Sequence, residues 1–290
     1  MNFSKSAVFS LYIFFYILLS TSHAAEVIRY PKEDALFPKH HQYPIELLKL
    51  ALSYQSNTIH IAPSDFLMTQ GRAIRQLAAA KDIDVMWTMT SKQRESEIRA
   101  IRIPIYKGLI GWRIFLSTEE WLLDKGGKKL DLESLKKATI IQGHDWPDTE
   151  ILKYNNFNVL EGSDYAGLFQ VLSFNRAELF PRSIIEIWNE LDSYASSNIR
   201  LELNTLISYP TASYFFVSPN NEALAKIIKN GLISAHKDGS FELLFNKYYL
   251  ELINKSELNS RQHYRLVNPL LPKKTPLDKK LYWFHLNKVN

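Results

Sequence analysis

The sequence predicts an α/β protein of two lobes that are joined by a double hinge. Three observations predict this fold. Strand-like runs alternate with helical patterns, this alternation occurs twice, and each half of the chain contains a long extended stretch, at residues 101–117 and 201–218. Alternating strands and helices favour a parallel sheet covered by helices. Two such units, connected by two extended crossings, form two lobes with two hinge strands between them.

The first unit begins with three strand-like runs separated by two helical patterns. Pro44 opens the first helix, because proline suits a first helical turn, and apolar residues recur at helical spacing from Ile45 to Leu52. The second helix is centred on Ile74 and Leu77. The strand-like runs are EVIRY at residues 26–30, TIHIA at residues 58–62 and DVMW at residues 84–87.

The same alternation resumes after a loop of glycines and lysines at residues 125–129. The strand-like runs of this second unit are ATIIQG at residues 138–143, NVLEG at residues 158–162 and AELF at residues 177–180. Helical patterns lie between and after these runs, at residues 165–174, 183–194, 222–236 and 241–250. A Pro-rich tail without a regular pattern ends the chain. We predict lobe boundaries at residues 25–112 for the first lobe, 113–210 for the second lobe, and 211–290 for a C-terminal return to the first lobe with the tail.

The composition is that of an ordinary folded protein. The chain has 290 residues, of which 46% are hydrophobic, so it can bury a large core. Its formal net charge is +5, and its lysine clusters at residues 125–129 and 273–280 are short. A nucleic-acid interface needs a denser basic stripe, so we interpret both clusters as solvated faces and expect no nucleic-acid partner. Cysteine is absent, which excludes a disulfide framework, a thiol nucleophile and thiolate metal ligands.

The N-terminus predicts export from the cytoplasm. A positive charge at Lys5 precedes an apolar or small run at residues 7–20, and small residues stand at Ser22 and Ala24. This order is typical of a secretory signal peptide, residues 1–24, that is cleaved after Ala24. A membrane anchor is the alternative, but the run is shorter than the ~20 apolar residues that cross a bilayer.

The stretch QGHDWPDTEIL, residues 142–152, places several acidic residues around a tryptophan and a proline. It is typical of a helix start after a buried strand. Gly143 permits a sharp turn, Asp145 is suited to capping, Pro147 suits the first helical turn, and Asp148 complements the positive end of the helix dipole.

The same stretch is a weak candidate for a metal or catalytic site. His144 is the one histidine beside these carboxylates, whereas a metal site needs several ligands on facing positions. His40 and His41 are adjacent, so their side chains diverge, and we expect them on the surface. The paired carboxylates leave open acid–base catalysis of the glycoside-hydrolase kind, as the less favoured alternative. We expect no metal, no cofactor and no catalytic residue, because no triad order and no Gly-rich phosphate loop is present.

Three longer stretches of the sequence match the motifs of one known protein family. The first, from Asp84, is DVMWTMTSKQRESEIRAIRIPIYKGLIGWRIFL, with a strand, a Thr-rich turn and an arginine before the first crossing. The second, from Leu130, is LDLESLKKATIIQG, which precedes the first strand of the second lobe, and the third, from Asn221, is the helix pair NEALAKIIKNGLISAHKDGSFELLFNKYY. In these motifs the chain resembles the type II periplasmic solute-binding proteins, in the amino-acid-type branch of that family. The resemblance covers residues 26–250, and the tail at residues 266–277 lies outside it and marks a divergent subfamily.

In the first lobe, the resemblance implies a ligand-binding arginine. The family's arginine after the Thr-rich turn receives a carboxylate in a forked pair, and Arg94 is its counterpart here, although its spacing from Thr90 is one residue longer. A surface salt bridge is the alternative. Trp87 and Thr88 end the preceding strand, where α/β sheets expose ligand-facing residues, and a core position is the alternative for Trp87. Arg72, with Arg75, either lines the cleft or covers the polar face of its helix.

In the second lobe, the resemblance places the helix start at residues 142–152 on the cleft side. We expect Trp146 to stack on a ligand there and Asp148 to take a hydrogen bond or a cation from it. Arg182 occupies the neighbourhood where the family holds the ligand's ammonium, and a cation there attracts an anionic group instead. An ion pair with Glu186, one helical turn on, is the alternative for this arginine.

On the second crossing, Tyr209 and Tyr214 stand near a hinge, from which a phenol reaches a cleft, and aromatic core packing is the alternative. The resemblance implies a monomeric periplasmic protein that captures a small anionic or amino-acid-like solute between two lobes. It implies a membrane permease or a sensor kinase as the partner. A sensory or interaction protein on the same fold, with no transport role, remains open.

Overall fold

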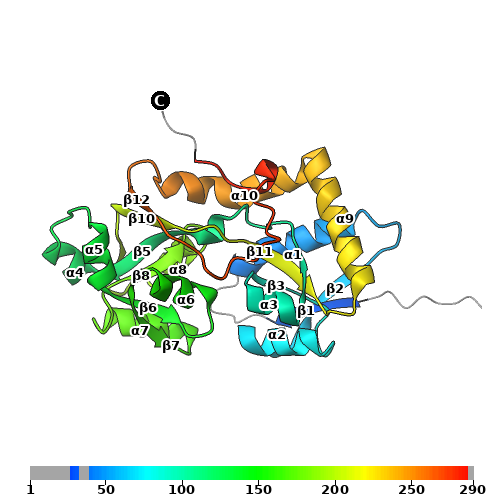
Figure 1. Ribbon diagram of the computed structural model, residues 1–290, viewed down its shortest axis with the longest axis horizontal. Coiled ribbons are helices and arrows are strands. Elements are labelled where there is room, and N and C mark those ends of the chain that lie inside the picture. The colour runs from blue at the N-terminus through cyan, green and yellow to red at the C-terminus, as the bar shows by residue number, and fades with distance from the viewer. Residues whose placement is uncertain (1–26, 33–38, 287–290) are drawn as a thin grey trace, which may run out of the picture.

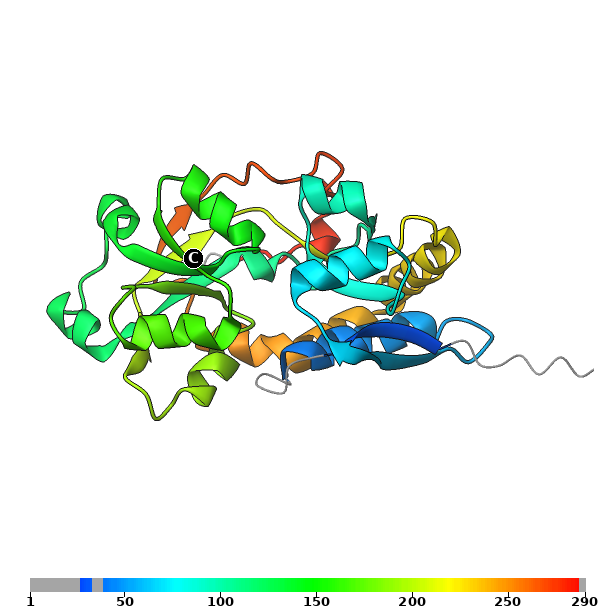
Figure 2. The ribbon, with the colours of Figure 1, turned by 90° about the horizontal axis from the view of Figure 1, so that it is seen from below.

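The computed structural model describes residues 27–32 and 39–286, and it has two lobes that lie side by side (Figure 1). The predicted signal peptide, residues 1–24, lies outside the described residues. Strands lie between helices in each lobe. The two longest of the described helices are α9 (Glu222–Asp238), at the end of the first lobe, and α10 (Ser240–Lys255), which extends along the long axis of the molecule (Figure 1, Figure 2). Within the described ranges, no helix combines the length and the apolarity needed to cross a bilayer.

The described part of the first lobe contains five strands and four helices. Its strands are β1 (Val27–Lys32), β2 (His60–Leu67), β3 (Val85–Met89), β4 (Arg99–Ile101) and β11 (Ser213–Val217). Its helices are α1 (Lys39–Leu52), α2 (Gln70–Ala78), α3 (Lys92–Glu97) and α9 (Glu222–Asp238). Strands β1 and β2 are parallel, whereas β11 lies between β3 and β4 and is antiparallel to both. Every residue of β11 is buried, and after Ser213 its sequence is a run of aromatic and apolar residues, which is typical of a strand covered on both faces.

The second lobe contains seven strands and five helices. Strands β12 (Gln262–Arg265), β10 (Thr205–Ser208), β5 (Trp112–Thr118) and β8 (Phe180–Ser183) form a sheet in that order, and β9 (Ile199–Leu201) pairs with β5. Strands β6 (Thr139–Gly143) and β7 (Asn158–Gly162) form a parallel pair. The helices are α4 (Glu119–Asp124), α5 (Leu132–Lys137), α6 (Pro147–Tyr154), α7 (Tyr165–Ser173) and α8 (Ile187–Ser193).

Two chain crossings form the double hinge between the lobes, as the sequence predicts. The two crossings lie next to each other and are joined by backbone hydrogen bonds. The Ile105 amide donates to the Ser213 carbonyl at 3.0 Å, and the Tyr209 amide donates to the Gly111 carbonyl at 3.1 Å. Gly111 permits this approach, since a Cβ there would lie 2.3 Å from the Tyr209 carbonyl oxygen. The first crossing is not one continuous strand, because the short 3-10 helix η1 (Leu109–Gly111) interrupts it.

Helix α10 (Ser240–Lys255) and the tail contact both lobes. The ring of Tyr249 lies 4.8 Å from that of Tyr43 in the first lobe, and Ser256 accepts from the Trp188 indole of the second lobe at 3.2 Å. Strand β12 then pairs with β10, so the prediction that residues 211–290 return to the first lobe is wrong for residues 262–265. An exposed edge of β10 is what accepts this short strand.

After β12, the tail crosses from the second lobe to the first over the hinge (Figure 1). The amide of Val267 donates to the side chain of Asn155 at 3.1 Å, which lies at the end of α6. The Asn268 side chain donates to the hinge carbonyl of Pro210 at 2.9 Å, and the amide of Lys92 in α3 donates to the Leu270 carbonyl at 3.0 Å. Within four successive positions, residues 267–270, the tail therefore contacts the second lobe, the hinge and the first lobe.

Several predicted element bounds shift in the structure. Helix α1 extends past Pro44 to Lys39, since one proline removes a single hydrogen-bond donor near the helix start. Strand β8 begins at Phe180, later than the run AELF, and α8 begins at Ile187 rather than at Ser183. Arg182 therefore lies in a strand, and not directly before a helix.

The partly buried imidazole of His236, in α9, makes stability depend on pH. Its ring stacks on Phe241 at 3.9 Å, and burial, together with the positive charge of Lys107, lowers the pKa of His236 to about 4. The unfolded chain has the ordinary histidine pKa of about 6.5 and binds the proton first. Above about pH 6.5, His236 is neutral in both states and does not reduce the free energy of unfolding. As the pH drops from about 6.5 towards 4, the free energy of unfolding falls by on the order of 1–2 kcal/mol, after allowance for partial solvent screening.

Urea unfolding between pH 4 and pH 7 measures this loss. The His236→Phe variant, which keeps a stacking ring without a titrating group, is expected to lose less stability over this range than the wild type. His60→Phe, at an exposed position of β2, is the matched control and retains the wild-type pH dependence. An identical pH dependence in His236→Phe and in the wild type would contradict the assignment.

Candidate functional site

A cavity of about 300 Å³ lies between the lobes and is lined by residues of both. Aromatic side chains form much of its wall: Trp87 in the middle of β3, Tyr106 on the first crossing, Trp146 before α6, and Tyr165 at the start of α7. The charged residues that line it are Arg113, Asp148, Arg182 and Glu186. Because both lobes supply its wall, the cavity changes shape when the lobes move.

The turn between β6 and α6 positions Trp146 and Asp148 at the cavity. Gly143 ends β6, and a Cβ on it would lie 2.5 Å from the Trp146 indole, so only glycine lets the ring lie on the backbone. Pro147 occupies the first turn of α6, as predicted, but the N-cap residue is Trp146 and not Asp145. Asp148 is in the first turn, where a carboxylate complements the helix dipole.

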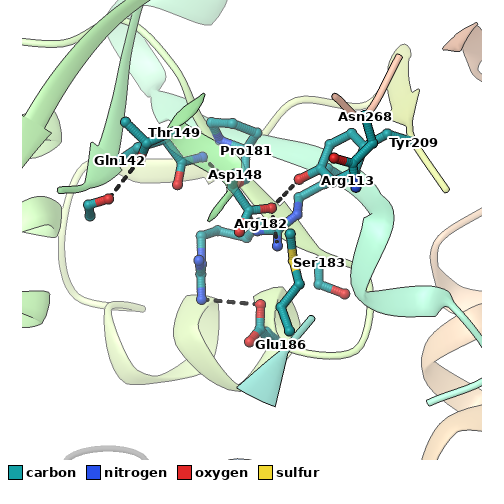
Figure 3. Close-up of polar contacts among 12 residues, drawn as sticks. Arg113, Gln142, Asp148, Thr149, Pro181, Arg182, Ser183, Glu186, Tyr209 and Asn268 are labelled. Carbon is teal, nitrogen blue, oxygen red and sulfur yellow. Dashed lines mark hydrogen bonds and ion pairs between the residues drawn. The ribbon is translucent and has the colours of Figure 1, made fainter. Parts of the chain in front are cut away.

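Asp148 neutralises Arg113 inside the wall (Figure 3). Their charged atoms lie 2.6 Å apart, and the two residues are only 4% and 2% exposed. The hydroxyl of Tyr209 donates to the same carboxylate, from behind the cavity wall. Burial opposes the charge of Arg113, but the attraction of Asp148 outweighs it and raises the pKa of this guanidinium. Tyr209 itself does not line the cavity.

Arg182 is neutralised by two glutamates. Its Nε donates to Glu190 at 2.8 Å and its Nη2 to the other oxygen of that carboxylate at 2.6 Å, while Glu186 lies 3.2 Å away. Burial opposes its charge, but Glu190 holds the pKa of Arg182 well above its ordinary value. The guanidinium also lies 4.8 Å from the ring of Trp146. The prediction that a helix begins directly after Arg182 is wrong, because α8 begins only at Ile187, and the alternative pairing of Arg182 with Glu186 is present.

Arg94 joins the lobes rather than lining this cavity. Its Nη1 donates to the Thr88 hydroxyl at 2.6 Å and to the Met89 carbonyl at 2.9 Å, and its Nη2 donates to Gln70 and to the Asp145 carbonyl at 3.0 Å. Burial lowers the pKa of Arg94 to about 10. The alternative of a surface salt bridge is wrong, because the residue is only 7% exposed. The two terminal nitrogens that were predicted to bind a ligand carboxylate donate to protein acceptors instead.

A second cavity, of about 470 Å³, lies next to the first and shares Trp146 and Pro147 with it. Arg94 lines this second cavity, as do Arg75 of α2 and Leu270 of the tail. Arg72 is exposed and lines neither cavity, so the sequence pointed to the less suitable arginine of α2. Within the described residues, no group of three or more histidine and acidic side chains is placed to hold a metal ion.

The structure brings together five of the predicted residues at the first cavity: Trp87, Thr88, Trp146, Asp148 and Arg182. Tyr214 is fully buried in a small apolar cluster of the first lobe, which is the core alternative. Sequence reasoning missed Arg113 and also His41, whose ring lies 5.7 Å from that of Trp87 and lines the cavity. One signal for Arg113 existed: a charged residue inside an apolar strand sequence needs a buried partner.

No family model and no curated protein sequence matches the chain, whereas solved structures match its fold. An ancestral arginine-binding protein bound to arginine is 16% identical with a TM-score of 0.59, over 78% of this chain and 100% of that chain. A Salmonella typhimurium periplasmic binding protein of high arginine specificity is 13% identical with a TM-score of 0.58, over 78% and 100%. A histidine kinase sensor domain with similarity to periplasmic binding proteins is 13% identical with a TM-score of 0.58, over 78% and 96%. These similarities confirm the predicted two-lobed α/β fold of periplasmic binding proteins.

Proposed function

We propose that this protein captures a small solute between its two lobes, in the periplasm, and presents it as a monomer to a membrane permease or a sensor kinase. One observation carries the proposal: the cavity of about 300 Å³ takes its wall from both lobes. A solute that contacts both lobes makes its full set of contacts only when they are closed, so binding favours the closed form. The arginine-binding proteins of the same fold support delivery of a solute to a permease, and the kinase sensor domain supports presentation to a sensor kinase.

A sensory or interaction role without transport is the second candidate, and the similarity to a histidine kinase sensor domain favours it. An enzyme is disfavoured by the state of the charged groups in the wall. Asp148 and Glu190 are each held in an ion pair with an arginine, and neither is poised to exchange a proton with a substrate. The carboxylates that suggested glycoside hydrolysis, Asp148 and Glu150, also do not line one cavity together.

Ligand-dependent stabilisation tests the proposal. The purified protein is screened against amino acids, amines, dicarboxylates, small peptides and sugars by thermal unfolding. A solute at a concentration of 100 times its Kd adds about 2.7 kcal/mol to the free energy of unfolding, which is a readily measured shift in Tm. A folded protein that no solute class stabilises would argue against the proposal.

Tryptophan fluorescence is expected to report binding, because Trp87 and Trp146 line the cavity. A stabilising solute that displaces water from these indoles changes their emission. The variants Trp87→Phe and Trp146→Phe are each expected to remove part of this change, while Trp121→Phe, in α4 and away from the cavity, retains all of it. An equal signal in all three variants would place the solute elsewhere.

A further inference from the structure

Arg94 lies between the two cavities, at a point where the lobes meet. Its acceptors within its own lobe, Gln70, Thr88 and Met89, line the first cavity, whereas Arg94 itself and Asp145 line the second. The Nη2 of Arg94 reaches from the first lobe to the second and donates to the Asp145 carbonyl at 3.0 Å. The guanidinium therefore separates one cavity from the other and joins the lobes by a direct hydrogen bond.

The first lobe holds this guanidinium in place. Nη1 donates to the Thr88 hydroxyl at 2.6 Å and to the Met89 carbonyl at 2.9 Å, and Nη2 donates to the Gln70 side chain. The backbone of Arg94 is held as well, because its amide donates to the side chain of Ser91, the N-cap of α3, at 3.1 Å. None of these four bonds depends on the second lobe. The side chain is therefore ordered before the lobes close, and closing them costs little of its rotamer entropy.

The second lobe holds the acceptor in the same way. Asp145 lies in the turn between β6 and α6. In this turn the Trp146 amide donates to the Gly143 carbonyl at 3.1 Å, and the Thr149 hydroxyl donates to the same oxygen at 2.6 Å. Donor and acceptor are thus each positioned by their own lobe, and they meet only when the lobes are closed.

The bond between the lobes is stronger than a surface contact, because Arg94 is only 7% exposed. Burial lowers the pKa of Arg94 to about 10, which keeps the guanidinium charged at neutral pH. A hydrogen bond from a charged donor contributes more to stability than one between neutral groups. The bond is also short-ranged, since a rotation that lengthens it from 3.0 Å to beyond about 3.5 Å breaks it.

We infer that Arg94 is a latch that holds the two lobes closed in the absence of a solute, through its hydrogen bond to the Asp145 carbonyl. This inference goes beyond the proposed function, because it concerns the protein without a solute. A solute then adds its contacts to a closure that the protein already makes by itself.

The distance between two spin labels, one on each lobe, tests the inference. The chain has no cysteine, so Arg72→Cys in α2 and Ser163→Cys before α7, both at exposed positions, are the only attachment sites. Dialysis in urea and refolding remove any solute bound during expression, and pulsed electron paramagnetic resonance then gives the distribution of distances.

We expect a single short distance, that of closed lobes, in the labelled protein. In Arg94→Gln a second, longer distance is expected. The ratio of closed to open molecules falls about 10- to 100-fold, the range for one hydrogen bond from a charged group. Gln70→Ala, which removes an acceptor that orients Arg94, is expected to change the distribution in the same direction and by less.

Arg99→Gln is the matched control, because this exposed arginine also donates to a backbone carbonyl, that of Pro219, but within the first lobe. Its distances are expected to equal those of the labelled parent. Urea unfolding verifies that each variant is folded. Where Arg94→Gln is not folded, Gln70→Ala takes its place, and an unchanged distribution in that variant would overturn the inference.

Two further results would overturn the inference. One is a labelled parent whose lobes are open without a solute, whatever the variants show. The other is a folded Arg94→Gln with the distances of the parent. Both results leave the proposed function standing, since a solute can close the lobes without a latch, and thermal unfolding with candidate solutes tests that function separately.

Discussion

Asp148→Ala is expected to lower the free energy of unfolding by about 3–5 kcal/mol, the usual cost of leaving one partner of a buried ion pair without the other. Arg113 is only 2% exposed, and the carboxylate of Asp148 lies 2.6 Å from its guanidinium. The substitution also removes the acceptor of the buried Tyr209 hydroxyl. Urea unfolding measures the change, and Asp124→Ala, in an exposed ion pair with Lys125, is expected to stay within about 0.5 kcal/mol of the wild type.

A double variant separates the lost ion pair from lost packing. Asp148→Leu combined with Arg113→Met replaces both charges by apolar groups, and it is expected to regain most of the stability, because a buried ion pair is often matched by apolar side chains of similar volume. A cost below about 1 kcal/mol for Asp148→Ala would mean that water reaches Arg113 in solution. A double variant as unstable as the single one would assign the loss to packing.

Gly231→Ala is expected to destabilise the protein, which reverses the usual effect of this substitution. Within an exposed helix, replacing glycine by alanine raises the free energy of unfolding by up to about 1 kcal/mol. Gly231 lies where α9 packs on α1, and a Cβ there would lie 1.8 Å from the Ala51 carbonyl oxygen. The helices have to separate to admit the methyl group, so we expect a loss of about 1–3 kcal/mol or more.

Asn230→Ala is the matched control for Gly231→Ala, because it changes the adjacent, exposed position of the same helix. It is expected to leave stability unchanged or to raise it slightly, through the higher helix propensity of alanine. Thermal unfolding of both variants gives the comparison. A rise in Tm for Gly231→Ala would show that α9 shifts on α1 without cost.

The fold could be predicted from the sequence because its signals are local. The alternation of strands and helices, the two extended crossings and Pro147 at a helix start depend on short stretches of chain, and each is present in the structure. Strand β12 could not be predicted, since its sequence QHYR has no apolar pattern, and it pairs only because the edge of β10 is available.

The cavity residues were predicted where they lie in a recognisable strand, as Trp87 and Thr88 do in β3, or at the start of a helix, as Trp146 and Asp148 do at α6. Their electrostatic state could not be predicted. Arg113 and Asp148 are separated by 35 residues, the difference between their positions, and only the folded sheet brings them together. The pairing of Arg182 with Glu190 depends on where α8 begins, and the sequence pattern placed that start four residues too early.

The tail restricts how the lobes can move apart. Val267 is bonded to the second lobe and Leu270 to the first, and three residues of fully extended chain span roughly 11 Å at most. While these hydrogen bonds hold, the lobes cannot separate by translation on the side of the tail. They can only rotate about an axis near the tail and the two crossings, so the gap widens with distance from that axis. The cavity between the lobes can therefore open only on the side opposite the tail, and the length of the segment between Val267 and Leu270 sets the largest opening angle.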